Sequence, residues 1–185
     1  MTLMKKLSLY IFLGLLWCNI SFSQEDFSID GMSLGDSALK YYSEKKIKKR
    51  TENIYGDNLY TQFTSTSKNS NSEYDSHQIH YKLGDKNYII ESVAGVKWTE
   101  SFDQCKKSKK KIKKELSIFF SIEKTEWIDQ EYEDDEGKTN ASFFYFDNGD
   151  SVDIQCTDWN STVEFRDNLR VSLWTAEFGK FITSN

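Results

Sequence analysis

An amphipathic helix between residues 99 and 119 places the strongest constraint on the fold. Apolar side chains recur there at three- and four-residue spacings, which place them on one helix face: Phe102, Cys105, Ile112, Leu116 and Phe119. Lys109 fills the one gap in this stripe, and Thr99 is the predicted N-cap. Because a helix with a single apolar face must bury that face, the rest of the chain has to supply an apolar surface for it.

The segments around this helix are patterned mainly as strands. Asn148-Gly149 separates the runs 142–146 and 151–156, and this is a strong hairpin signal because both turn residues tolerate positive φ. A weaker helix capped by Asp36 or Ser37 is expected through residue 50. Further strands are expected at 27–32, 59–65, 77–83, 87–93, 126–133 and 169–175, and a short terminal helix at 177–182. The predicted fold class is α+β, with two helices packed on an antiparallel sheet.

An offset of 64 residues aligns the two halves of the chain. Gly31 then matches Gly95 and Ser37 matches Ser101, and each half contains a helix followed by three strands in the same order. The matching order of elements favours a tandem α-β-β-β repeat, with units at 31–94 and 95–158 plus a C-terminal strand. We expect residues 24–185 to form a single α+β domain of this kind.

The N-terminus has the features of a secretory signal peptide over residues 1–23. Lys5 and Lys6 precede an apolar run at 7–20 that is too short to span a membrane, and Ser21-Phe22-Ser23 favours cleavage between Ser23 and Gln24. A lipoprotein with Cys18 as its first residue is the alternative, although Trp17 is unsuited to that cleavage. The predicted product is exported, either periplasmic or secreted, and has no integral membrane segment once the signal is removed.

Charge and cysteine content narrow the classes of protein further. Loss of the leader removes two lysines and changes the net charge from −5 to −7, which argues against a nucleic-acid partner. The remaining cysteines, Cys105 and Cys156, are predicted to form a structural disulfide in an oxidising compartment. Two buried free thiols are the alternative. Closing a loop of about fifty residues is worth about 4 kcal/mol in the chain-entropy model.

The stretch from Gly31 to Ser37 contains two hydrolase-like patterns, G-x-S-x-G and the beginning of G-D-S-x-L. A serine hydrolase using Ser33 or Ser37 is therefore one hypothesis. Its chemistry requires a histidine base and an acid, yet no histidine follows His80, and the usual D-x-x-H partner motif is absent. The same residues are also typical of a capped helix start. We therefore favour a non-enzymatic protein and leave the hydrolase as the alternative.

Other residue groups give weaker indications of binding. Asp147, Asp150 and Asp153 lie along a hairpin and do not form a calcium loop, so neither a metal nor a cofactor is predicted. The lysine-rich run 106–114 is either a solvated helix face or a docking patch for an anionic partner. Exposure of Trp98, Trp127 and Trp159 in one cluster would favour a glycan- or ligand-binding module.

Three stretches resemble a set of small exported bacterial proteins of unknown function: Gly31–Ser37, Glu91–Val96 and the closing region with Asp158-Trp159 and Asp167–Ser172. This resemblance implies no activity. The tandem helix-plus-sheet outline is also similar to the β-lactamase-inhibitor type of fold and to small outer-membrane assembly lipoproteins, although this chain lacks both a proper lipobox and a recognisable inhibitor motif. Those families act by protein–protein contact. The leading hypothesis rests on the export signal, the predicted disulfide, the two-unit sheet and the lack of an assembled catalytic set. It is an exported, soluble protein that binds another macromolecule, such as a protein partner, through a sheet face or hairpin loops.

Overall fold

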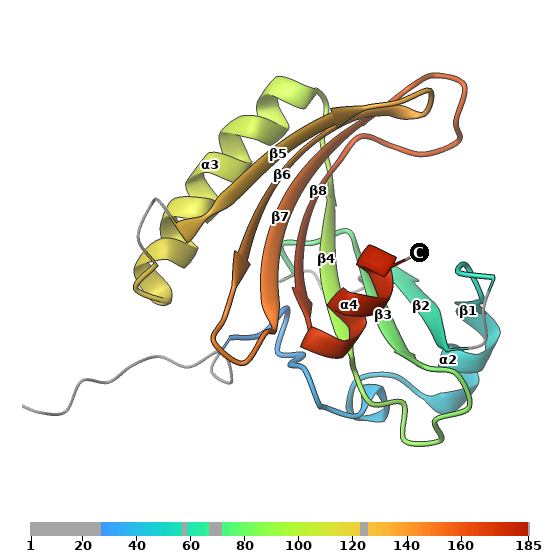
Figure 1. Ribbon diagram of the computed structural model, residues 1–185. Helices are drawn as coiled ribbons and strands as arrows, with labels where there is room; N and C mark the ends of the chain where they lie inside the picture. Colours follow the sequence, from blue (N-terminus) through green and yellow to red (C-terminus); the bar gives the residue numbers. More distant parts are fainter. Residues whose placement is uncertain (1–26, 57–58, 67–71, 123–125, 185) are drawn as a thin grey trace, which may run out of the picture.

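A computed structural model of the chain describes residues 27–56, 59–66, 72–122 and 126–184 (Figure 1). The predicted signal peptide, its cleavage point between Ser23 and Gln24, and Cys18 lie outside the described residues. Among the residues described, no helix has the length and apolar character needed to cross a bilayer.

The described elements combine helices with a larger number of strands. The helical elements are η3 (Ala38–Lys40), α2 (Glu44–Arg50), α3 (Phe102–Phe119) and α4 (Ala176–Ser184). The strands are β1 (Thr51–Glu52), β2 (Tyr60–Thr66), β3 (Ser76–Lys82), β4 (Ser92–Trp98), β5 (Ile128–Glu133), β6 (Gly137–Tyr145), β7 (Ser151–Trp159) and β8 (Asn168–Trp174). The α+β class predicted from the sequence is confirmed, and the sheet dominates the structure.

All eight strands form one antiparallel sheet in the order β1-β2-β3-β4-β8-β7-β6-β5. Each half of the chain contributes four consecutive strands, and the halves meet where β4 pairs with β8. The predicted repeat assigned three strands to each unit and left the C-terminal strand outside. In the sheet, β8 occupies the position in the second half that β4 occupies in the first.

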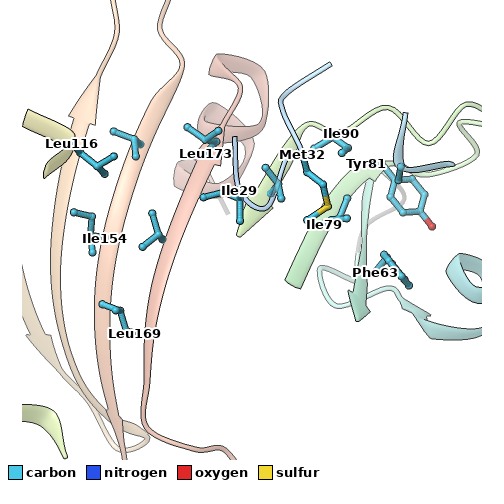
Figure 2. Close-up of a cluster of buried hydrophobic side chains, with 14 of the residues drawn as sticks. Ile29, Met32, Phe63, Ile79, Tyr81, Ile90, Leu116, Ile154, Leu169 and Leu173 are labelled. Carbon is cyan, nitrogen blue, oxygen red and sulfur yellow. The ribbon is translucent and has the colours of Figure 1, made fainter. Parts of the chain in front are cut away.

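The two faces of the curved sheet are covered differently, as Figure 1 shows. The outer face carries α2, α3 and residues 27–42, and its apolar side chains form the main core. Ile29 and Met32 of the N-terminal segment lie between the side chains of the two halves of the sheet (Figure 2). On the inner face, α4 covers one end, and Tyr55 of the β1–β2 connection packs beside it.

The structure joins Cys105 of α3 to Cys156 of β7, with the Sγ atoms 2.00 Å apart and the Cα atoms 5.7 Å apart. Both residues are fully buried in the core. The amphipathic stripe of α3 therefore lies on the outer face of β7 and β8, as the spacing of its apolar residues predicts. Lys109 in the stripe is also buried, and its Nζ donates to Asn140 Oδ1 at 2.5 Å.

The segment around Gly31 differs from the predicted edge strand. Ile29 and Met32 form a two-residue turn, in which Asp30 and Gly31 both have positive φ, at 50° and 80°. The helix expected after it is divided. Ser37 caps the short turn η3 by accepting from Leu39 N at 3.2 Å, and Ser43 caps α2 separately. The long helix begins two residues later than predicted, because Ser101 and not Thr99 is its cap.

The predicted strand at 87–93 is wrong over its first half. Residues 88–90 bind the N-terminal segment, where Ala38 N donates to Tyr88 O at 2.9 Å and Ile90 N donates to Asp36 O at 2.8 Å. β4 therefore begins only at Ser92, and its connection to β3 is longer than a compact hairpin turn. A long-range backbone pairing has replaced the first part of the strand expected at 87–93.

Gly95 provides a sharp test of packing on the outer face. A Cβ atom at this position would lie 2.5 Å from the ring of Tyr74, which covers β4 here. We predict that Gly95→Ala lowers the free energy of unfolding by about 1–3 kcal/mol, because the ring must move. Gly179→Ala in α4 is the control, since the nearest atom lies 4.0 Å away, and it should be neutral or slightly stabilising. Urea denaturation measures both; equal stability of the two variants would contradict this account.

Candidate functional site

The two serines of the hydrolase hypothesis make local contacts. Ser33 Oγ donates to Phe27 O at 3.4 Å, and Ser37 Oγ donates to Asn87 O at 2.5 Å. Among the described residues, neither hydroxyl has a histidine as its hydrogen-bond partner. The stretch therefore has the geometry of a turn and a cap, and it does not assemble a nucleophile with a base.

The two histidines lie on opposite faces of β3, as a strand requires. On the outer face, His77 Nε2 contacts Asp30 Oδ2 at 2.8 Å, and its Nδ1 contacts the Tyr42 hydroxyl at 3.2 Å. On the inner face, His80 Nε2 contacts Gln62 Oε1 at 3.0 Å. Each ring is thus part of a separate buried network that positions its neighbours.

The acidic and lysine-rich groups also have structural partners. Asp150 accepts from Ala176 N at 2.7 Å, whereas Asp153 is buried in the sheet, and no set of three metal-binding side chains occurs among the described residues. On α3, three lysines of the predicted cationic run form ion pairs with acidic residues: Lys106 with Asp103, Lys111 with Glu115, and Lys113 with Asp129. This pairing weakens the case for a docking patch on that helix.

The inner face contains a groove of about 600 Å³ that crosses six neighbouring strands from β1 to β7. Side chains alternate between the faces of a strand, so Cys156 faces α3 while Thr157 faces the groove. The groove is lined by Glu52, Ile54, Gln62, Gln78, Val96, Trp98, Thr157, Trp159, Glu164, Phe165, Arg166, Asn168 and Arg170. We take this groove as the candidate functional site.

Aromatic side chains lie in the part of the groove next to the C-terminal end of β4. Trp98 is 40% exposed and Phe165 is 65% exposed, and the Phe165 ring lies 5.0 Å from the Trp159 ring. Asp167 connects the end of β7 to the residue that follows β4. Its carboxylate accepts from Trp159 N at 2.9 Å, and its carbonyl accepts from Thr99 N at 3.0 Å.

Only part of the tryptophan cluster that would favour a ligand-binding module is assembled. Trp98 and Trp159 line the same groove. Trp127 is instead buried near α3, where its Nε1 donates to Ser117 Oγ at 2.9 Å. Trp174 contacts Phe178 of α4, with 5.9 Å between the ring centroids.

Polar side chains share the floor of the groove with Val96, which lies opposite Arg170 in the sheet. Arg170 Nη2 donates to Gln155 Oε1 at 2.9 Å, and Arg170 has no ion-pair partner among the described residues. The Gln78 amide likewise has no hydrogen-bond partner within the described ranges, whereas the Gln62 amide is held by Thr64 and His80. Two arginines and two glutamates line the groove, so their formal charges cancel.

Beside the groove floor lies a strip of buried polar side chains. Asp153 is 1% exposed, and neither carboxylate oxygen has a hydrogen-bond partner of good geometry among the described residues. Burial raises the pKa of Asp153 to about 6, although the nearby charge of Arg170 and the polar groups of Ser172 and Gln155 oppose the shift. Burial lowers the pKa of His80 to about 3, and the positive charge of Arg170 adds to that effect.

The other end of the inner face is occupied by α4. Phe178 is 1% exposed; its ring is stacked on His80 at 4.8 Å and lies 5.1 Å from Tyr60. Glu177 forms an ion pair with Lys82 at 2.7 Å. The C-terminal helix thus closes this end, and the open groove is confined to the end that carries Trp98.

Sequence reasoning missed most of the groove. Gln62, Gln78 and Arg170 are unremarkable polar residues at alternate strand positions, and only the order of the strands brings them together. Phe165 offered one usable signal, because it is a large aromatic residue in the otherwise charged and polar segment 164–168.

Asp153 predicts a measurable dependence of stability on pH. Between about pH 4 and 6 the folded protein retains a proton that the unfolded chain releases, so the free energy of unfolding should fall as the pH rises through this window. Asp153→Asn should remove this fall and stabilise the protein at pH 7 by up to about 3 kcal/mol. Asp147→Asn in the exposed β6–β7 turn is the charge-matched control. Urea denaturation from pH 4 to 8 measures all three proteins, and the same pH profile in Asp153→Asn would contradict the prediction.

Comparison of the chain with models of protein families, with curated proteins and with solved structures gave no match. The resemblance of the Gly31–Ser37, Glu91–Val96 and Asp158–Ser172 stretches to small exported bacterial proteins therefore stays a prediction. The function of the groove has to be inferred from its own residues.

Proposed function

We propose that this chain is an exported, non-enzymatic protein that binds another macromolecule in the groove of its inner sheet face. The observation that carries the proposal is the combination of exposed aromatic side chains and unpaired polar groups in one groove. Trp98 and Phe165 are large, rigid and exposed, and Arg170 lies on the floor with no ion-pair partner among the described residues. Tryptophan and arginine are the residue types that most often dominate binding energy at interfaces.

Export is supported by two independent features. The leader over residues 1–23 has the basic start, apolar run and small-residue cleavage site of a signal peptide. The buried disulfide between Cys105 and Cys156 is the kind of bond that forms and persists in oxidising compartments. The periplasm and the extracellular medium both meet these conditions.

A tandem origin of the two halves is part of the same proposal. Each half has a helix followed by four strands, and the two sets of strands meet antiparallel at β4 and β8. The groove then lies across the junction between the units and takes residues from both. A binding surface shared by two units explains why neither half contains the site alone.

The proposed function predicts that the groove can be crosslinked to its partner in the organism that expresses the protein. A photoreactive p-benzoylphenylalanine in place of Phe165 should give covalent adducts of higher mass on illumination, because this side chain lies at the groove. The same amino acid in place of Ile118, which is 71% exposed on α3, is the matched control and should give few adducts. Adding Trp98→Ala should suppress the adducts at position 165. Gel electrophoresis of the exported protein detects them.

Two results would contradict the proposed function. The first is crosslinking at position 165 that is absent or no stronger than at position 118. The second is hydrolysis of generic ester substrates by the purified protein that is lost in Ser33→Ala or Ser37→Ala, which would restore the enzyme alternative. Since both serines contact backbone carbonyls in the structure, we expect no such loss.

A further inference from the structure

The shape of the groove indicates a chain-like ligand. Its lining residues come from six neighbouring strands, β1-β2-β3-β4-β8-β7, and five strand spacings of about 4.8 Å correspond to about 24 Å. A compact metabolite would fill only a part of that length. A linear polymer lying across the strands would contact residues from both halves of the sheet.

The aromatic residues provide flat surfaces and little depth. Trp98 comes from the end of β4, and Trp159 with Phe165 comes from β7 and the connection after it, so only β8 lies between the strands that carry the two tryptophans. The electron-rich face of an aromatic ring attracts the weakly positive C–H groups on the face of a sugar ring, and it also removes apolar surface from water. These rings can therefore bind sugar units, which have no side chain that would need a deep pocket.

The floor of the groove, on β3 and β8, offers planar groups that form hydrogen bonds. The Gln78 amide has no hydrogen-bond partner among the described residues, and Asn168, whose Nδ2 donates to Arg166 O at 2.9 Å, keeps its Oδ1 as an acceptor near Arg170. Amide and guanidinium groups suit pairs of neighbouring hydroxyl groups, because each can make two bonds in one plane.

The charges exclude a strongly ionic ligand. Glu52 and Glu164 balance Arg166 and Arg170, so the groove has no net formal charge even though the chain is acidic. We propose that the groove binds a glycan, in the form of a linear chain of uncharged sugar rings. This inference rests on the proposed function, since it names the ligand class for the same groove. Sugar rings stack at Trp98 and Phe165, and the hydroxyl groups bind Gln78, Asn168 and Arg170.

The experiment screens the purified, disulfide-bonded protein against an array of neutral and acidic glycans, followed by calorimetry with the best hexasaccharide. We expect binding of a neutral glycan that changes less than about twofold between 50 and 300 mM NaCl, because no net charge is involved. Trp98→Ala and Gln78→Ala should each weaken binding about tenfold or more, while Trp98→Phe should retain part of it. Ile118→Ala on α3 is the control and should leave the affinity unchanged.

The outcomes separate this inference from the proposed function. A partner crosslinked at position 165 that resists protease but is shortened by glycosidases supports both. A crosslinked partner that is digested by protease, together with no glycan bound at about 1 mM, overturns the glycan inference and leaves the groove as a protein-binding site. Binding restricted to acidic glycans, or unaffected by Trp98→Ala, also overturns it. Circular dichroism of each variant shows whether a loss of binding comes from unfolding.

Discussion

The pairing of β4 with β8 is the interaction on which the rest of the structure depends. It joins two four-stranded halves into one sheet through seven residue pairs, from Ser92 opposite Trp174 to Trp98 opposite Asn168. Its register decides which side chains face the core, because a shift by one residue would exchange the two faces. In this register Val93 and Leu173 enter the apolar outer core, while Ala94 and Ser172 face inward. The groove exists only because the same pairing brings Trp98 close to residues from β7.

The contrast between the two faces is itself informative. Neighbouring residues on the same strands alternate between apolar groups such as Ile154, directed at α3, and polar groups such as Asp153, directed inward. A buried carboxylate without good hydrogen bonds destabilises the folded state, and an apolar residue at this position would avoid that penalty. Natural sequences depart from such local rules mainly where function requires it. The polar inner face thus supports the binding role proposed for the groove.

The elements that depend on local residues were predictable from the sequence, and those that depend on distant partners were not. The stripe of α3, the Asn148-Gly149 turn and the pairing of Cys105 with Cys156 follow from spacing and chemistry along the chain. The strand expected from residue 87 does not form there, because residues 88–90 are hydrogen-bonded to the N-terminal segment instead. The groove could not be predicted from the sequence for a similar reason. Its residues come from six strands, and no local pattern specifies that β4 adjoins β8.

The Gly31–Ser37 stretch shows how a local motif can serve the site without supplying its chemistry. Its turn inserts Ile29 and Met32 between the two halves of the sheet on the outer face, and Asp30 is fixed there by His77. On the same face the disulfide ties α3 to β7. These contacts pack against the outer face of the sheet, and under the proposed function the groove on the inner face is shaped by the fold itself. A groove prepared in this way loses less conformational entropy on binding, which strengthens affinity without adding contacts.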